Sequence, residues 1–403
     1  MKATITPSVL KGEIKAPPSK SMAHRLLISA GLSEGESVIS SVAYSEDILA
    51  TLDCLRVMGA DIKEDKDTVT IKGASPVINE ERVFSARESG STLRFFVPIL
   101  LLSEKMQTFQ GYGRLMERPM SVYSEICREK GLYFSQENGT LKCKGRLEGG
   151  KFTVKGDISS QFISGLLFSL PLASENSTIE LIPPVESVDY INMTIDAMKS
   201  FGVEIKWQNE TTLFIKGNQK YQSRNLSVEG DYSNAAFIES FNLFGGEVKT
   251  TGLNENSLQG DKVYREYFKK LNEGTPTLDV RNCPDLAPIL MTVASMKNGA
   301  VLTGTRRLKI KESDRAEVMK EELSKFGAKI TVKENEVIIE KTNLHSPKGQ
   351  LYAHNDHRVA MSLSVIASLY GGTIEGAECV KKSYPDFFTQ MKKLGLEVKL
   401  SDD

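Results

Sequence analysis

The chain has little of what marks a secreted, metal-binding or membrane protein. Its 403 residues include five cysteines, an odd number, and no two of them form a Cys-x-x-Cys pair. We therefore expect no disulfide framework and no zinc site, and a reducing cytoplasm as the location. The four histidines lack metal-ligand spacing, so we expect no metal. The longest apolar run, Phe95–Leu102, is too short to span a bilayer, and Met1 to Lys20 lacks the apolar run of a signal peptide.

An excess of charge of one sign is also absent. Lys and Arg number 51 and Asp and Glu number 52, which gives a formal net charge of −1. No overall field therefore favours nucleic acid or an anionic membrane, and basic residues are not interleaved with aromatic ones. An anion site must come from a local group of Lys and Arg. The length suggests two domains.

One pattern does recur: an amphipathic helix, a glycine that ends it, a strand, a polar turn and a second strand. The glycines that end these helices are Gly59, Gly131, Gly202, Gly274, Gly327 and Gly395. A glycine after the last helical turn is the expected left-handed cap, and the alternating apolar residues after it predict half-buried strands. Gly274 is expected to mark a degenerate copy. The pattern predicts six copies of one α/β unit, three in each of two domains.

A second set of helices is more apolar, and each is preceded by a polar cluster. The predicted helices cover residues 22–30, 93–102, 162–173, 235–244, 286–296 and 359–370. Helix N-termini carry about half a positive charge and unpaired N–H groups, so several aimed at one place would bind an anion. Ordinary N-capping by Ser, Asp and Asn is the plainer interpretation. It does not explain why Lys20, Arg25, Gln161 and Arg358 accompany the caps.

These clusters resemble the signatures of the EPSP synthase (3-phosphoshikimate 1-carboxyvinyltransferase) family of enolpyruvyl transferases. The motifs that carry the resemblance are Pro18–Arg25, Glu88–Arg94, Glu117–Pro119, Gly156–Gln161, Lys311–Arg315, Asn355–Arg358 and Lys382–Asp386. They keep the order of the family and extend over essentially the whole chain. The resemblance implies an α/β (α+β) fold, a two-domain inside-out α/β barrel of six repeated βαβαββ-type units. Residues 18–227 would form a continuous domain, and residues 1–17 with 228–403 a discontinuous one.

The resemblance also implies two substrates and the residues that bind them. Shikimate 3-phosphate would be bound by Lys20, Ser21, Arg25, Ser159, Ser160, Gln161, Ser187, Asp285 and Lys311. Phosphoenolpyruvate would be bound by Lys20, Gly90, Arg118, Gln161, Arg315, Arg358 and Lys382. Asp285 would be the base that takes the proton of the 5-hydroxyl, and Glu312 the acid that protonates C3 of phosphoenolpyruvate. We expect no cofactor, no partner beyond these small molecules, and a cytoplasmic monomer.

Taken singly, several motifs have plainer interpretations. Lys311–Arg315 could begin a solvated helix, with Asp314 and Glu317 as a capping box. Asp285 could be a simple N-cap, Arg118 part of a surface turn, and Ser187 a surface serine.

The chain also departs from the family pattern. Arg307 stands where some members have a substrate-contacting Asn, Glu88 and Ser89 where some have Asn-Ala, and Phe95 where a proline is often found. These departures put inhibitor sensitivity in doubt.

Two alternatives remain at this point. The sister enolpyruvyl transferases that act on UDP-N-acetylglucosamine usually carry a cysteine at the position that is Gly113 here. A non-catalytic binder of phosphorylated metabolites would be expected to have lost its acid or base. Asp285 and Glu312 are both present, which favours the enzyme.

Overall fold

The computed structural model describes residues 1–402, and the chain divides into two compact units. The continuous unit is Pro18–Glu229, and the discontinuous unit combines Met1–Pro17 with Gly230–Asp403. Each unit has its own core of buried apolar side chains. Val228 packs into the core of the continuous unit, and the N–H of Ser19 donates to the carbonyl of Glu229 at 2.8 Å. Val228 and Glu229 therefore belong with the continuous unit.

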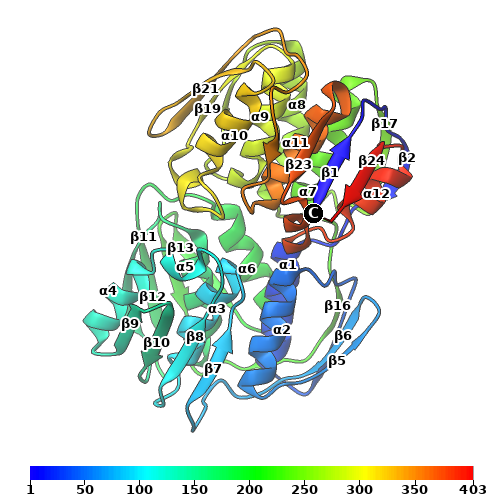
Figure 1. The fold of residues 1–403 in the computed structure, drawn as a ribbon. Coiled ribbons are helices and arrows are strands. Elements are labelled where there is room, and N and C mark those ends of the chain that lie inside the picture. The colour runs from blue at the N-terminus through cyan, green and yellow to red at the C-terminus, as the bar shows by residue number, and fades with distance from the viewer. Residues whose placement is uncertain (403) are drawn as a thin grey trace. The chain divides into compact units, whose positions relative to one another are not determined.

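The larger sheets of the continuous unit share one topology (Figure 1). In spatial order, the strands of one sheet are β7 (Arg82–Ser85), β8 (Gln107–Gln110), β10 (Thr140–Lys144) and β9 (Tyr133–Glu137). Those of the next sheet are β11 (Gly150–Lys155), β12 (Ser177–Ile182), β14 (Thr212–Ile215) and β13 (Ile205–Asn209). Those of another sheet are β16 (Asn225–Ser227), β4 (Glu36–Ser40), β6 (Thr68–Lys72) and β5 (Asp61–Asp65). In each, the first strand is parallel to the second, and the remaining pairs are antiparallel. A short pair, β3 (Ser33–Glu34) with β15 (Tyr221–Gln222), is parallel.

In the continuous unit, the apolar helices begin two or three residues before their predicted starts at 22, 93 and 162, and amphipathic helices alternate with them. The helices are α1 (Lys20–Gly31), α2 (Glu46–Met58), α3 (Gly90–Leu100), α4 (Ser121–Lys130), α5 (Ser160–Ser169) and α6 (Val188–Ser200), with short 3-10 turns η1 (Leu115–Glu117) and η2 (Leu170–Leu172). Most residues of α1, α3 and α5 are buried. The side chains of Ser19, Ser89 and Ser159 accept hydrogen bonds from N–H groups in the first turns of α1, α3 and α5. Capping by these serines is confirmed.

The discontinuous unit repeats the same sheet topology twice. Its sheets are β22 (Leu351–Tyr352), β23 (Gly372–Glu375), β1 (Lys2–Ile5) and β24 (Val398–Ser401), and β18 (Thr277–Asp279), β19 (Ala300–Thr303), β21 (Glu336–Glu340) and β20 (Lys329–Val332). In Figure 1 the blue β1 lies between β23 and the red β24, and it is antiparallel to both. The start of the chain thus completes a sheet made by its end. A further sheet holds only β2 (Lys11–Lys15) and β17 (Glu247–Thr251), which are parallel.

In the discontinuous unit, the apolar helices begin within three residues of their predicted starts at 235, 286 and 359, and other helices alternate with them. The helices are α7 (Tyr232–Ser240), α8 (Tyr264–Glu273), α9 (Ala287–Met296), α10 (Arg315–Ser324), α11 (His357–Tyr370) and α12 (Phe387–Lys393), and the 3-10 turns are η3 (Phe241–Phe244), η4 (Gly260–Val263), η5 (Pro284–Leu286), η6 (Arg306–Ile310) and η7 (Ala377–Lys382). Asp231 and Asp356 cap α7 and α11. Asp285 lies inside η5 and caps neither η5 nor α9, so its interpretation as a simple N-cap is wrong.

The glycines predicted to end the amphipathic helices have the left-handed conformation with one exception. The φ angles are 117° at Gly59, 68° at Gly131, 81° at Gly202, 93° at Gly327 and 106° at Gly395. Gly274 follows α8 with φ 179°, which is extended backbone, so the left-handed cap predicted there is wrong. The strand after Gly274 is β18, which belongs to another sheet, and no antiparallel pair is added to β2 and β17 in residues 1–402. No helix within those residues is long and apolar enough to cross a membrane.

His24 makes the stability of the continuous unit depend on pH. It is buried in α1, with Nδ1 2.8 Å from Oγ1 of Thr51. Burial, aided by the charges of Lys20 and Arg25, holds the pKa of His24 well below its ordinary value of 6.5. Below pH 6.5 His24 therefore binds a proton in the unfolded chain but not in the folded protein, which favours unfolding.

We expect the free energy of unfolding to fall by up to about 1.4 kcal/mol per pH unit between that ordinary value and the lowered pKa. Urea unfolding at about pH 7.5 and about pH 5.5 measures this, followed by the fluorescence of Trp207, the single tryptophan, which lies in the same unit. His24→Asn should lose less stability on acidification than the wild type. His345→Asn, at an exposed position, is the control and should behave as the wild type. An unchanged pH dependence in His24→Asn contradicts this account.

Candidate active site

In the continuous unit, Lys20 lies at a junction of helix starts. It is the first residue of α1, and its Nζ lies 2.7 Å from Oδ2 of Asp47 near the start of α2. The hydroxyl of Thr92 in α3 donates to the carbonyl of Asp47 at 3.4 Å. The starts of α1, α2 and α3 are thus linked. Sequence reasoning missed Asp47, although the cap residue Ser45 marks the helix that carries it.

Arg118 lies against the first residue of α3. A Cβ atom added at Gly90 would be 2.7 Å from Nη1 of Arg118 and 3.3 Å from Nη1 of Arg94. Nε of Arg118 is buried, and within residues 1–402 its guanidinium forms no ion pair and Nε has no hydrogen-bond partner. A half-buried cation beside the positive end of a helix is stabilised by an anion. This arrangement suits the binding of an anion.

Gln161 connects α5 to α3 at the same place. Its Oε1 accepts a hydrogen bond from Nη1 of Arg94 at 2.7 Å, and its Nε2 donates to Oγ of Ser91 at 2.8 Å. The guanidinium of Arg94 also lies 5.0 Å from the ring centroid of Phe162. Arg94 was not predicted as a site residue, although it ends the motif that begins at Glu88. We refer to Lys20, Asp47, Gly90, Arg94, Arg118 and Gln161 as the Lys20 cluster.

Arg25 is buried between α1 and α6. Its Nε donates to Oγ1 of Thr194 at 2.8 Å, its Nη2 to the carbonyl of Tyr190 at 3.0 Å, and its Nη1 to the carbonyl of Ser21 at 2.5 Å. Burial lowers the pKa of Arg25 to about 10, so it stays charged at neutral pH. The α6 partners of Arg25 could not be identified from the sequence, because they lie far along the chain.

The serines predicted to bind phosphate lie at two helix starts. Ser159 caps α5 and Ser160 is its first residue. Ser187 immediately precedes α6 with φ 57° and ψ 41°, and its side chain does not cap the helix. Ser187 is buried, so its interpretation as a surface serine is wrong. A serine in the left-handed region is strained, and such strain is concentrated at functional sites.

In the discontinuous unit, Asp285 is the centre of an ion-pair network. Its Oδ1 lies 2.8 Å from Nη1 of Arg315 and 3.3 Å from Nζ of Lys311, and its Oδ2 lies 3.0 Å from Nη2 of Arg358. We refer to Asp285, Lys311, Glu312, Arg315, Asp356 and Arg358 as the Asp285 cluster. A carboxylate that receives so many positively charged donors is held in a fixed orientation.

Arg315 begins α10, and its side chain is only 1% exposed. It also lies 2.7 Å from Oε2 of Glu312 and 2.8 Å from Oδ2 of Asp356, whose side chain is fully buried. Burial alone would lower the pKa of Arg315, but the charges of Asp356, Glu312 and Asp285 outweigh it and raise the pKa well above its ordinary value. The interpretation of this motif as solvated is therefore wrong for Arg315. The predicted capping of α10 by Asp314 is confirmed, because its side chain accepts a hydrogen bond from the N–H of Glu317.

Burial acts to lower the pKa of both Arg358 and Lys311, but the net shifts of the two pKa values have opposite directions. Burial would lower the pKa of Arg358, but the charge of Asp285 raises it, and the net result is a raised pKa. The pKa of Lys311 is lowered, mainly by burial and only partly opposed by Asp285. Arg358 also donates to Oγ of Ser233 in α7 at 2.5 Å, which links α7, η5 and α11.

Two further predicted positions lie near this network. Lys382, in η7, donates to the carbonyl of Asn355 at 2.8 Å. Arg307 is buried and donates to the carbonyl of Arg281 at 2.6 Å, and its charge contributes to the lowered pKa of Lys311.

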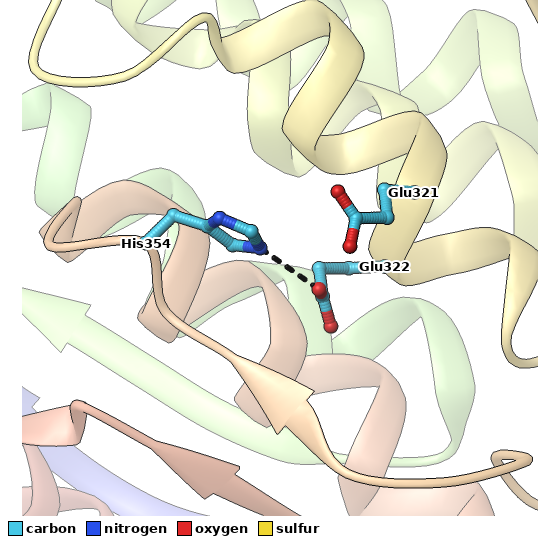
Figure 2. A group of neighbouring side chains, drawn as sticks. All are labelled: Glu321, Glu322 and His354. Atoms are coloured by element: carbon cyan, nitrogen blue, oxygen red, sulfur yellow. Dashed lines mark hydrogen bonds and ion pairs between the residues drawn. The ribbon is translucent and has the colours of Figure 1, made fainter.

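One group within residues 1–402 has the donor types of a metal site. The ligand atoms of Glu321, Glu322 and His354 lie within 4.8 Å of one another (Figure 2). Nζ of Lys325 lies 2.7 Å from Oε1 of Glu322, so this carboxylate already forms an ion pair with an ammonium group. None of these residues belongs to the predicted set.

Most of the predicted residues of each unit therefore lie in or near the first turns of helices. The Lys20 cluster offers cations and helix N–H groups to anions. The Asp285 cluster has three carboxylates, of which Asp356 is fully buried, while Asp285 and Glu312 lie next to cations that can hold an anionic substrate. This combination suits proton transfer to and from a bound anion.

Comparisons with known proteins agree with these features. A family model described as EPSP synthase (3-phosphoshikimate 1-carboxyvinyltransferase) matches residues 5–391. The 3-phosphoshikimate 1-carboxyvinyltransferase of Clostridium perfringens is 43% identical over 418 residues, with 98% of this chain and 98% of the relative covered. That of Clostridium acetobutylicum is also 43% identical, with 98% and 97% covered. A solved EPSP synthase from Acinetobacter baumannii has a TM-score of 0.80 at 24% identity and covers 100% of both chains. Sequence, family model and curated relatives all lead to one assignment: the chain belongs to the EPSP synthase family.

Proposed function

We propose that the chain transfers the enolpyruvyl group of phosphoenolpyruvate to the 5-hydroxyl of shikimate 3-phosphate. The products are 5-enolpyruvylshikimate 3-phosphate, a precursor of aromatic amino acids, and inorganic phosphate. The proposal rests on the ion pairs that hold the Asp285 carboxylate to Arg315, Lys311 and Arg358, in a chain that belongs to this family. The curated relatives are named for this activity.

Asp285 and Glu312 divide the proton transfers in this proposal. Asp285 takes the proton of the 5-hydroxyl, whose oxygen then bonds to C2 of phosphoenolpyruvate. Glu312 gives a proton to C3, and the electrons of the double bond form the new C3–H bond. In the second step C3 loses a proton to the Glu312 carboxylate, the double bond re-forms, and phosphate leaves C2 with the proton that Asp285 had taken, which restores both carboxyl groups. No metal ion and no covalent bond to the protein enters this sequence.

Shikimate 3-phosphate would be bound mainly by the continuous unit. Ser21 and Arg25 would hold its carboxylate; Ser159, Ser160 and Ser187 its phosphate; Gln161 its ring; and Lys20 would reach both substrates. The start of α5 supports the phosphate assignment, because Ser160 is buried there beside helix N–H groups. The strained backbone of Ser187 supports it independently.

Phosphoenolpyruvate would be bound by the second set of residues that the resemblance implies. Arg315 and Arg358 would hold its carboxylate, and Gly90, Arg118, Gln161 and Lys382 its phosphate. Nε of Arg358 is buried without a hydrogen-bond partner in the described residues, and so is Nε of Arg118. Buried donors of this kind favour an anionic ligand at both places.

We further propose that each unit is an inside-out barrel of three repeated βαβαββ-type units, with its apolar helices inside. The shared strand order of the four-stranded sheets supports this, and the two-stranded β2–β17 sheet would be the degenerate copy. We also propose a cytoplasmic monomer. Size-exclusion chromatography with light scattering tests the monomer.

Phosphate release by the purified protein tests the proposed reaction. Release from phosphoenolpyruvate that requires shikimate 3-phosphate supports it. Release that requires UDP-N-acetylglucosamine instead would assign the chain to the sister enzymes. If folded protein binds shikimate 3-phosphate but releases no phosphate with either acceptor, a non-catalytic binder is favoured.

Removing the acid or the base should stop turnover and leave binding intact. We expect Asp285→Asn and Glu312→Gln each to lower kcat by a factor of about 100 or more, since each removes a proton-transfer group. Calorimetry should show shikimate 3-phosphate affinity within about threefold of the wild type, because the amides keep the shape of the site. Asp279→Asn removes a carboxylate that pairs with Arg281 outside the site and is the control. Loss of substrate binding in both variants would show that the roles are misassigned.

Gly90→Ala should weaken phosphoenolpyruvate binding without unfolding the protein. The new methyl group would lie 2.7 Å from Nη1 of Arg118, the end of a flexible side chain that can move. We expect the KM for phosphoenolpyruvate to rise about tenfold and the free energy of unfolding to change by less than about 0.5 kcal/mol. Gly274→Ala is the control, since no atom lies within 4 Å of its added Cβ and its backbone is extended. An unchanged KM in Gly90→Ala contradicts the assignment of Gly90 and Arg118.

A further inference from the structure

Glu322 is a buried carboxylate outside the Asp285 cluster. It lies in α10 seven residues after Arg315, close to two helical turns, so both side chains leave the same face of the helix. Its side chain is fully buried. Burial would raise the pKa of Glu322, but hydrogen bonds from His354, Lys325 and the backbone outweigh it, and the pKa is lowered. Glu322 is therefore ionised, and its charge must be compensated locally.

The compensating groups are Lys325, which directly follows α10, and the segment that leads into α11. Oε1 of Glu322 lies 2.7 Å from Nζ of Lys325 and 2.9 Å from Nε2 of His354, and Oε2 accepts a hydrogen bond from the N–H of Tyr352 at 3.0 Å. Figure 2 shows the bond between Glu322 and His354. Lys325 also donates to the carbonyl of Gln350 at 2.9 Å. One carboxylate thus fixes the backbone and a side chain of the segment from Tyr352 to His354.

This segment has an unfavourable backbone that needs such support. His354 and Asn355 are consecutive residues in the left-handed region, with φ 50° and 56°. Each non-glycine residue held there costs about 1–3 kcal/mol and persists only where its surroundings impose it. The turn directs the carbonyl of Asn355 to Nζ of Lys382, 2.8 Å away. It ends at Asp356, the cap of α11, two residues before Arg358.

One face of α10 therefore contacts this segment at two points. Arg315 binds Asp356 at the start of α11, and Glu322 binds Tyr352 and His354 before it. We infer that Glu322 is a positioning residue for phosphoenolpyruvate binding: it holds the left-handed turn His354–Asn355, which sets the positions of Lys382 and Arg358. The inference rests on the proposed function for what Lys382 and Arg358 bind. No hydrogen bond joins Glu322 to either of them in residues 1–402, so it acts through the turn.

A metal ion is the competing interpretation of the same side chains. Glu321, Glu322 and His354 have suitable donor atoms within 4.8 Å. Both oxygens of Glu322, however, already accept hydrogen bonds, one of them from the ammonium of Lys325. Glu321 is exposed and does not take part in these bonds. The network is complete without an ion.

Glu322→Gln and Glu321→Gln form a matched pair of variants that remove one charge each at adjacent positions. In Glu322→Gln the amide cannot satisfy Lys325, His354 and Tyr352 together, so the turn should loosen. We expect the KM for phosphoenolpyruvate to rise about tenfold, with a smaller change in kcat and shikimate 3-phosphate affinity within about twofold of the wild type. Glu321→Gln should match the wild type. His354→Ala keeps the Glu322–Lys325 pair and should raise the KM by about threefold, which provides a test should Glu322→Gln fail to fold.

Hydrogen exchange gives a readout that does not depend on activity. Peptides that cover residues 350–358 should exchange faster in Glu322→Gln than in Glu321→Gln, and those from 18–229 should not change. If the wild type released no phosphate, the proposed function would fail, while the exchange data would still decide whether Glu322 holds the turn.

Three results overturn the inference. The first is a wild-type KM and wild-type exchange in Glu322→Gln. The second is loss of protection throughout both units, which would indicate a purely structural residue. The third is loss of activity on EDTA treatment together with equal damage in Glu321→Gln, which would indicate a metal site.

Discussion

The compensation of buried positive charge is the constraint on which the rest of the structure depends. Arginines and lysines at the starts of apolar helices add to the positive end of each helix dipole, and burial makes that combination costly. In the discontinuous unit, Asp285, Glu312 and Asp356 balance Lys311, Arg315 and Arg358. In the continuous unit, Asp47 balances Lys20, whereas Arg118 has no carboxylate partner within residues 1–402.

This difference gives the two clusters different parts in the proposed chemistry. Around Arg118 the missing negative charge would come from the substrate phosphate, so binding and compensation are the same event. Around Asp285 the cations are already held in place, and an incoming carboxylate would compete with Asp285 for Arg315 and Arg358. Such competition would weaken the hold of these cations on Asp285 and so make it a better base. Preformed cations also reduce the reorganisation that the reaction requires.

Local features of the fold could be predicted from the sequence, and contacts between distant residues could not. The caps Ser19, Ser89 and Asp356 and the glycine after α2 depend on neighbours within a turn or two, so the pattern of residues reveals them. The left-handed cap predicted at Gly274 was wrong because this copy of the pattern lacks the strands that make such a cap necessary. The fold class was right in its mixture of helices and strands.

The candidate site shows the same division between local and distant information. Motif resemblance supplied Arg315 and Arg358, but Asp356, the ion-pair partner of Arg315, was not predicted as a site residue. The pairing of Lys20 with Asp47 spans 27 residues, and that of Glu322 with His354 spans 32, so neither follows from local periodicity. Partners of this kind are set by how helices pack, which the folded structure alone determines.

A crystal structure of Asp285→Asn with shikimate 3-phosphate and phosphoenolpyruvate bound would show whether substrate anions compensate the charge of Arg118. We expect the shikimate phosphate at Ser159, Ser160 and Ser187, and the phosphoenolpyruvate phosphate at Arg118 and Lys382. We expect the phosphoenolpyruvate carboxylate at Arg315 and Arg358. Substrate phosphates bound away from these residues, with Arg118 still lacking an anionic partner, would refute this charge compensation.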